Sequence, residues 1–168
     1  LLSRSIVLRT EDALLAGGGT FGGHVMAHSG RTRISGVELY GMGQQNRLAR
    51  YPLHFHWAGD VERKSYFTDN SIWRSNWRCA VIHRTDRAVV SRNVGYDVFG
   101  HCFYVEDGVE VDNEVSFNVA ARVKYMGSGD YGEQGLQDGV QVFASDDLVQ
   151  PADIAASGFY FANGDNHI

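Results

Sequence analysis

The sequence predicts an all-β protein, a right-handed parallel β-helix whose coils of about 23 residues stack into a solenoid. Three observations support this fold class. Apolar runs are short and strand-sized, 20 glycines stand against 2 prolines in 168 residues, and two stretches of the chain repeat at a fixed offset. Apolar residues at sustained helical spacing do not occur, which argues against long helices.

The apolar runs are separated by Gly, Asn or Asp, as is typical of strands that alternate with turns. The length of 168 residues does not require two domains, so residues 1–168 are expected to form one β-helix segment. We expect this segment to be a fragment of a larger protein. The polar, glycine-rich stretch 125–139 is expected to project from the stack as a loop. The strand candidates are His24–Ala27, Ile34–Tyr40, Leu53–Trp57, Cys79–His83, His101–Val105, Val115–Val119 and Ser157–Phe161.

The repeat is clearest around the two cysteines. Arg78–His83 superposes on His101–Glu106 with an offset of 23 residues, and Thr68–Ile72 superposes on Ser91–Gly95 with the same offset. Two successive coils of one solenoid produce this pattern. One coil earlier, Leu53–His56 aligns with Ala80–His83 at an offset of 27, which requires an insertion near residues 59–64.

Stacked coils place equivalent side chains above one another, about 4.8 Å apart, and neighbours along a strand point to opposite faces. The repeats therefore predict columns of side chains. If Phe55, Ile82 and Val105 point inward, the residues that follow them, His56, His83 and Glu106, form one outward column. The residues that precede them, His54, Val81 and Tyr104, form a second outward column. Asp60, Asp86 and Asp107 are expected in the adjoining turns.

The net charge of -5 conceals an asymmetry along the chain. Residues 1–92 hold 13 Lys and Arg against 7 Asp and Glu, whereas residues 93–168 hold 2 against 13. The basic part could form a surface for a polyanion or simply a solvated face. Nucleic acid is not expected, because the acidic part would repel it. No apolar run is long enough to span a membrane, and Leu1–Arg4 does not look like a signal peptide, so a targeting signal is expected outside this chain.

Several motifs resemble one known family. Arg50–Asp60, Arg78–His83 and Gly100–Gly108 resemble the cell migration-inducing and hyaluronan-binding protein, the transmembrane cell-surface hyaluronidase and the fibrocystin-like proteins. The resemblance implies a β-helix in an extracellular setting, with hyaluronan binding or depolymerisation in some members and no established enzymatic role in others. The chain departs from the hyaluronan-cleaving members before Phe21 and after Val123, which leaves the exact glycan open.

Carboxylates in this frame are candidates for acid and base catalysis. Hydrolysis of a glycosidic bond needs a proton donor and a carboxylate or activated water, and Glu106 and Asp107 are the leading candidates, with Asp60 as a further carboxylate. His83 and His56 share the column of Glu106 and complete the predicted catalytic set. The alternative is that Glu106, Asp107 and Gly108 form only a polar turn.

Histidines suggest a metal as a second hypothesis. His54 and His56, two residues apart on a strand, face the same way, and stacking could bring His24, His83 or His101 near them, with His24 taken as the candidate third ligand. The spacing matches no defined zinc motif. A calcium site in the acidic second half is an alternative, because calcium prefers oxygen ligands. The only cofactor expected is therefore a divalent cation, either calcium or a transition metal bound by histidines.

The remaining candidates would hold the substrate. Arginines would bind glycan carboxylates and aromatic rings would stack on sugars, although packing is an alternative role for each aromatic side chain. Cys79 and Cys102 are expected on adjacent coils, either as a disulfide or as two buried thiols. The predicted substrate-binding residues are Arg50, Tyr51, His54, Trp57, Arg84, His101 and Tyr104.

Together these residues predict a protein that acts on an anionic polysaccharide, and the resemblance implies a glycoside hydrolase of hyaluronidase type in an extracellular or cell-surface location; whether the bond is broken by hydrolysis or by elimination stays open. Two alternatives stay open: a non-catalytic glycan-binding or adhesion module, and a structural β-helix segment of a large surface protein. Two carboxylates about 5 to 10 Å apart in an open groove would favour hydrolysis, whereas scattered carboxylates on a flat surface would favour binding.

Overall fold

The computed structural model describes residues 4–11, 21–45, 47–125 and 156–168. All the regular elements in these ranges are β-strands, which confirms the all-β prediction; most of the loop expected at 125–139 lies outside them. The described residues include no helix that is long and apolar enough to cross a bilayer. The strands are β1 (Ile6–Arg9), β2 (Val25–Ala27), β3 (Arg33–Ser35), β4 (Val37–Tyr40), β5 (Leu53–Asp60), β6 (Tyr66–Thr68), β7 (Ser71–Trp73), β8 (Ala80–Asp86), β9 (Val89–Ser91), β10 (Val94–Phe99), β11 (Phe103–Val105), β12 (Glu114–Ser116), β13 (Val119–Lys124) and β14 (Phe159–Phe161).

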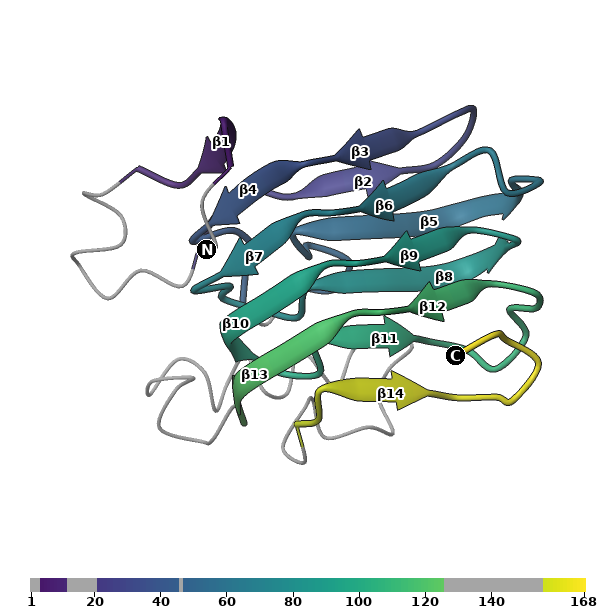
Figure 1. The fold of residues 1–168 in the computed structure, drawn as a ribbon. Helices are drawn as coiled ribbons and strands as arrows, with labels where there is room; N and C mark the ends of the chain where they lie inside the picture. Colours follow the sequence, from purple (N-terminus) through teal and green to yellow (C-terminus); the bar gives the residue numbers. More distant parts are fainter. Residues whose placement is uncertain (1–3, 12–20, 46, 126–155) are drawn as a thin grey trace.

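The strands form three parallel sheets that wrap around one axis (Figure 1). Their orders are β1-β4-β7-β10-β13, β14-β11-β8-β5-β2 and β12-β9-β6-β3. Each coil thus gives one strand to each sheet in turn, and the connections have the right-handed sense expected of parallel strands. The fold is the predicted right-handed parallel β-helix. We call the sheet that contains β5, β8 and β11 the site sheet.

Strand register confirms the repeat and shows where coils differ in length. β8 and β11 pair Ala80 with Phe103, at the predicted offset of 23 residues. β5 and β8 pair Leu53 with Ala80, at the predicted offset of 27, and a register shift lies between His56 and Gly59. The offset returns to 23 where Tyr66 pairs with Val89, so the extra residues lie at the bulge and the following turn. An earlier coil is longer, because Arg33 pairs with Tyr66.

Apolar side chains fill the inside of the β-helix. Phe55, Ile82 and Val105 occupy equivalent positions on β5, β8 and β11, and none is more than 1% exposed. Phe55 also stacks on Phe67 of another sheet, with 4.0 Å between ring centroids. Because side chains alternate along a strand, the residue that follows each of these three points out of the coil.

Asparagines form a second ladder, at the turns that lead into β7, β10 and β13. The Asn93 side-chain oxygen accepts hydrogen bonds from the backbone and side-chain nitrogens of Asn70, both at 3.0 Å. Its Nδ2 donates to Asn118 Oδ1 at 3.0 Å and to the Phe67 carbonyl at 2.9 Å. These bonds satisfy buried backbone groups where the chain turns. Asn70 and Asn93 match in the predicted superposition, which the structure confirms.

Cys79 and Cys102 form a disulfide between adjacent coils, with a Cα separation of 4.5 Å. Both side chains are fully buried. Of the two alternatives that the sequence leaves open, the structure contains the bridge. It joins the residue before β8 to the residue before β11, and so fixes the register of the two coils that carry the candidate site.

We expect the double variant Cys79→Ala/Cys102→Ala to unfold with a free energy about 3 kcal/mol lower than that of the wild type, since the bridge closes a loop of 23 residues in the unfolded chain. Chemical denaturation measured by circular dichroism checks this. The wild type in reducing agent is the control and should fall to the level of the variant. An unchanged unfolding midpoint would show that the bridge does not restrict the unfolded chain.

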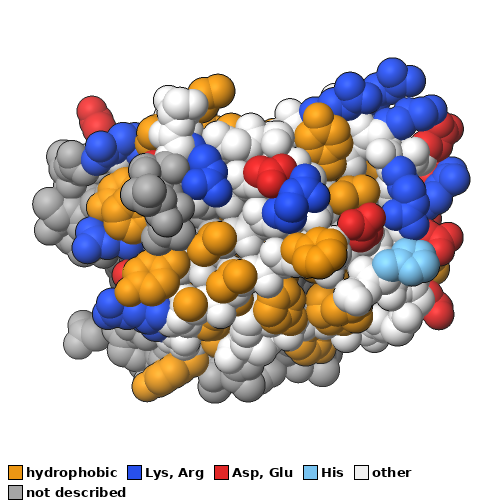
Figure 2. Space-filling model, viewed as in Figure 1, with side chains coloured by type: hydrophobic (Ala, Val, Ile, Leu, Met, Phe, Trp, Pro, Cys, Tyr) orange, Lys and Arg blue, Asp and Glu red, His pale blue; other side chains and the backbone are white. Residues whose placement is uncertain are grey.

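Among the residues that the structure describes, basic side chains lie beside acidic side chains of other coils. Basic and acidic side chains lie next to each other on the face shown in Figure 2. Arg92 is paired with Asp69 at 2.8 Å, and Arg63 lies 3.7 Å from Glu114. Stacking brings a basic residue of one coil beside an acidic residue of the next. On this face the described residues therefore form a surface of mixed charge.

Candidate active site

The predicted outward column lies on the site sheet. β5 and β8 pair His56 with His83, whose Nδ1 atoms are 3.1 Å apart. Glu106 directly follows β11, and its Oε2 lies 3.8 Å from His83 Nδ1. The structure thus brings His56, His83 and Glu106 together, as the repeat predicts.

Asp107 completes this arrangement from the turn after β11. His83 Nε2 and Arg84 Nε each lie 2.9 Å from Asp107 Oδ2. The carboxylates of Glu106 and Asp107 therefore approach different nitrogens of one imidazole ring, at 3.8 Å and 2.9 Å. Partial burial opposes ionisation of Asp107, but Arg84 and His83 outweigh it and hold the pKa of this carboxyl below its ordinary value.

An open cleft of about 560 Å³ gives access to these groups. Trp57 forms part of its wall and is 56% exposed. The Arg84 guanidinium lies 4.2 Å from the Trp57 ring centroid, as a cation–π pair. Trp57 has a positive φ of 54° at the β5 bulge, which turns its side chain out of the regular strand alternation. The cleft is lined by Leu48, Ala49, His56, Trp57, His83, Arg84, Glu106, Asp107 and Val109.

The second predicted column is outward but buried. His54, Val81 and Tyr104 occupy equivalent positions on the site sheet, and Tyr51 and Trp77 pack over them in a second apolar cluster. Sheet alternation determines which way a side chain points, whereas the segments that precede β5 and β8 determine whether solvent reaches it.

Arg78 holds this outer cluster together, a role that sequence analysis missed. Its guanidinium lies 3.8 Å from the Tyr104 ring centroid and donates to the Tyr51 hydroxyl at 3.0 Å. Its Nη1 is also 3.6 Å from Glu106 Oε1. Arg78 is almost completely buried and forms an ion pair with the buried Glu106. The signal in the sequence is an arginine placed between an aromatic residue and the strand start, in Trp77-Arg78-Cys79.

Three histidines lie close together at the cleft, and two of them line it. Each of His54, His56 and His83 offers a nitrogen, and these nitrogens all lie within 4.8 Å of one another. Burial lowers the pKa of His54 well below 6.5, although a hydrogen bond to the Ala49 carbonyl opposes this. Burial and the neighbouring His83 lower the pKa of His56 to about 4. These two imidazoles are neutral at physiological pH.

His24, predicted as a partner of His54 and His56, lies outside this group. β2 pairs Met26 with His54, so the position level with His56 belongs to His28, whose ring lies 5.1 Å from that of His56. His24 Nε2 instead lies 3.5 Å from the Arg50 guanidinium. The prediction for His24 is wrong because no repeat in the sequence aligns the first coil with the later coils. The histidines of the first coil could therefore not be assigned to columns.

Other predicted residues lie away from the cleft surface. Asp60 forms an ion pair with Arg87 and does not line the cleft. Arg50 also lies outside the lining, whereas Tyr51 and Tyr104 are buried in the outer cluster. His101 is buried next to Ser157, with 2.9 Å between Nδ1 and the hydroxyl oxygen. In this arrangement Trp57 and Arg84 are the predicted substrate-binding residues that reach the cleft.

Fold and site together define a class of protein: a parallel β-helix that carries a cleft of histidine, carboxylate, arginine and tryptophan side chains on one sheet. The chain belongs to the CEMIP β-helix family, whose sequence profile matches residues 20–168. This membership confirms the resemblance seen in the motifs.

Relatives of this chain are much longer proteins. It is 48% identical over 168 residues to a G8 domain-containing protein of Dictyostelium discoideum and 46% identical over 166 residues to Communication mutant protein F of the same organism, with 99% of the chain covered in each case. It is 38% identical over 141 residues, 74% of the chain, to the human Cell surface hyaluronidase CEMIP2. The matches span 14%, 15% and 10% of these relatives, respectively.

Proposed function

We propose that this chain is the glycan-cleaving part of an extracellular protein, and that it binds and hydrolyses an anionic polysaccharide such as hyaluronan. The observation that carries the proposal is that Glu106 and Asp107 each lie near a nitrogen of His83 within one open cleft. The relationship to a human cell-surface hyaluronidase supports the choice of glycan. The buried disulfide is compatible with an oxidising, extracellular location.

Hydrolysis requires one group that gives a proton to the leaving oxygen and one that accepts a proton from the attacking water. In the proposed site these two roles fall to Glu106 and Asp107. Asp107, ionised between Arg84 and His83, acts as the base. Glu106, the more buried of the two carboxyl groups, is assigned the role of the acid. His83 orients both carboxyl groups.

Two further groups in the cleft would hold the sugar chain. The exposed face of Trp57 is suited to stack on a sugar ring, and the Arg84 guanidinium is half-exposed and carries donors for a glycan carboxylate. Hyaluronan offers both features in each repeating disaccharide, namely a pyranose ring face and a uronate. The proposed specificity is therefore for an acidic glycan, with one uronate near Arg84.

A depolymerisation assay tests the proposal. High-molecular-mass hyaluronan incubated with the intact protein should shorten, as measured by size-exclusion chromatography with light scattering, whereas a neutral polysaccharide such as dextran should not. Binding of hyaluronan without shortening would replace the hydrolase by a glycan-binding module. Absence of both binding and cleavage would leave the structural β-helix segment as the better interpretation.

We expect Trp57→Ala to weaken hyaluronan binding about 10-fold, because loss of one sugar–aromatic contact of about 1.4 kcal/mol corresponds to this factor. Binding is measured by calorimetry with defined oligosaccharides. The matched control is Phe117→Ala, which removes an aromatic side chain that is 82% exposed and lies outside the cleft lining. Equal loss in both variants would contradict a sugar contact at Trp57.

A further inference from the structure

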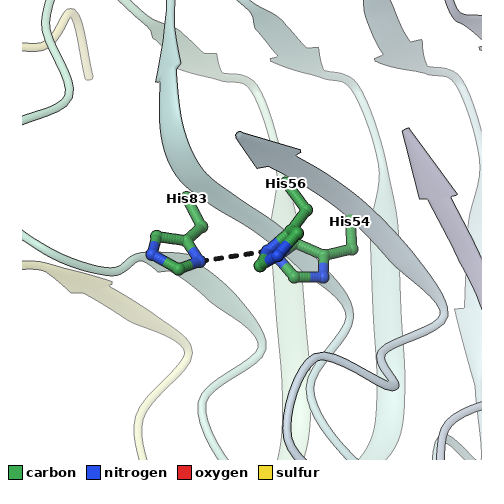
Figure 3. A group of neighbouring side chains, drawn as sticks. All are labelled: His54, His56 and His83. Carbon is green, nitrogen blue, oxygen red and sulfur yellow. Dashed lines mark hydrogen bonds between the residues drawn. The ribbon is translucent and has the colours of Figure 1, made fainter. Parts of the chain in front are cut away.

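The three imidazoles of His54, His56 and His83 point toward one another (Figure 3). His54 and His56 come from β5, and His83 comes from the neighbouring strand β8. The Nδ1 atoms of His56 and His83 are 3.1 Å apart. Two nitrogens bound tetrahedrally to one zinc ion, each about 2.0 to 2.1 Å from it, would be separated by roughly 3.3 Å. The observed separation needs little change to accept an ion.

His54 supplies an independent observation. Its side chain is completely buried, and its Nδ1 lies 3.1 Å from the Ala49 carbonyl oxygen, which fixes the proton on Nδ1. Its Nε2 is buried without a hydrogen-bond partner. Buried polar atoms without partners are rare in folded proteins and require an explanation. A bound cation would use this lone pair and remove the cost of leaving it unsatisfied.

His83 shows the outer contact that metal-binding histidines commonly make. Its Nε2 donates to Asp107 Oδ2 at 2.9 Å, which directs Nδ1 toward His56. A carboxylate behind a histidine fixes the ring and raises the basicity of the other nitrogen. The Ala49 carbonyl has the same function for His54. Two of the three imidazoles are therefore held with one nitrogen directed into the group.

We propose that His54, His56 and His83 form a binding site for one divalent transition metal ion, with zinc as the best match. Imidazole nitrogens suit zinc and its neighbours, whereas calcium requires oxygen ligands. Three protein ligands leave one position open, and Glu106 Oε2, 3.8 Å from His83 Nδ1, borders it. The inference deepens the proposed function, since His56 and His83 also line the cleft, but its test requires no glycan.

Zinc titration of the chelator-treated, intact protein tests the proposal by calorimetry, with cobalt(II) absorption as a second readout of nitrogen ligation. We expect wild type to bind one zinc ion more tightly than His56→Ala and His83→Ala by at least about 100-fold. Asp107→Asn should weaken binding by about 10- to 100-fold, through His83. Circular dichroism and thermal melting establish that each variant is folded, and the partly exposed position of His56 makes His56→Ala the safest of them.

His24→Ala is the matched control, because it removes a histidine that lies outside the group, and it should bind zinc as wild type does. Equal zinc affinity of wild type and His56→Ala would overturn the site, as would binding of calcium alone. Zinc binding without cleavage of hyaluronan would support the metal site and refute the hydrolase. Cleavage of hyaluronan by a wild-type protein that binds no zinc would support the hydrolase and refute the metal site.

Discussion

Glu106→Gln is expected to reduce depolymerisation of hyaluronan by at least about 100-fold while hyaluronan binding stays within a few-fold of wild type. The amide keeps the shape of the side chain but can neither give nor accept the proton, and general acid–base catalysis contributes about 10²- to 10⁴-fold. The contacts that hold the sugar are assigned to Trp57 and Arg84, which the substitution leaves in place. Product formation is followed by reducing-end release.

The control for this variant is Glu62→Gln, which changes an exposed carboxylate in the turn after β5. Glu106 lies 3.6 Å from the buried Arg78, and the substitution changes this contact, so thermal melting must show that the variant is folded at the assay temperature. Asp107→Asn provides a second test of the same site, at a more exposed carboxyl. Full activity in both folded variants would remove the two carboxyls from the mechanism.

The column of His56, His83 and Glu106 could be predicted from sequence because a β-helix is close to one-dimensional. Two stretches that match at one offset determine the register of whole strands, and alternation within the strand then assigns each residue to a face. Cys79 with Cys102 and Asn70 with Asn93 follow from the same offset. The prediction worked wherever both coils contain recognisable repeats.

Burial on the outer face could not be predicted in this way. Tyr51 and Tyr104 were expected to contact substrate, but Trp77 and the guanidinium of Arg78 cover them. The covering residues belong to connecting segments whose length and path do not repeat between coils. A pattern read from strands contains no information about what a connecting segment covers.

The first coil shows the same limit in another form. His24 directly precedes β2 and His28 directly follows it. Only the strand register decides which of the two histidines is level with His56. A coil of different length, such as the one in which Arg33 pairs with Tyr66, shifts that register by several residues. For the metal site, the sequence therefore indicated His54 and His56 with His24, His83 or His101 as the third member, and only the structure decides among these three in favour of His83.

Gly95→Ala is expected to lower the free energy of unfolding by on the order of 4 kcal/mol, the upper end of what overpacking a core costs. Gly95 lies in β10, directly against the disulfide. A Cβ atom at this position would lie 2.2 Å from Cys102 Sγ and 2.7 Å from Cys79 Sγ. Neither sulfur can move away, because each belongs to a covalent bridge between two hydrogen-bonded strands. Chemical denaturation measures the loss.

The sulfur atoms can be removed to test this cause. In the Cys79→Ala/Cys102→Ala background the space that they filled becomes empty, so Gly95→Ala should cost much less there than in wild type. The difference between the two backgrounds gives the coupling between the glycine and the bridge. An equal cost in both backgrounds would mean that the alanine strains the backbone of β10 rather than the packing against sulfur. A coupling of several kcal/mol would show that the disulfide fits between the two coils of the site sheet because Gly95 has no side chain.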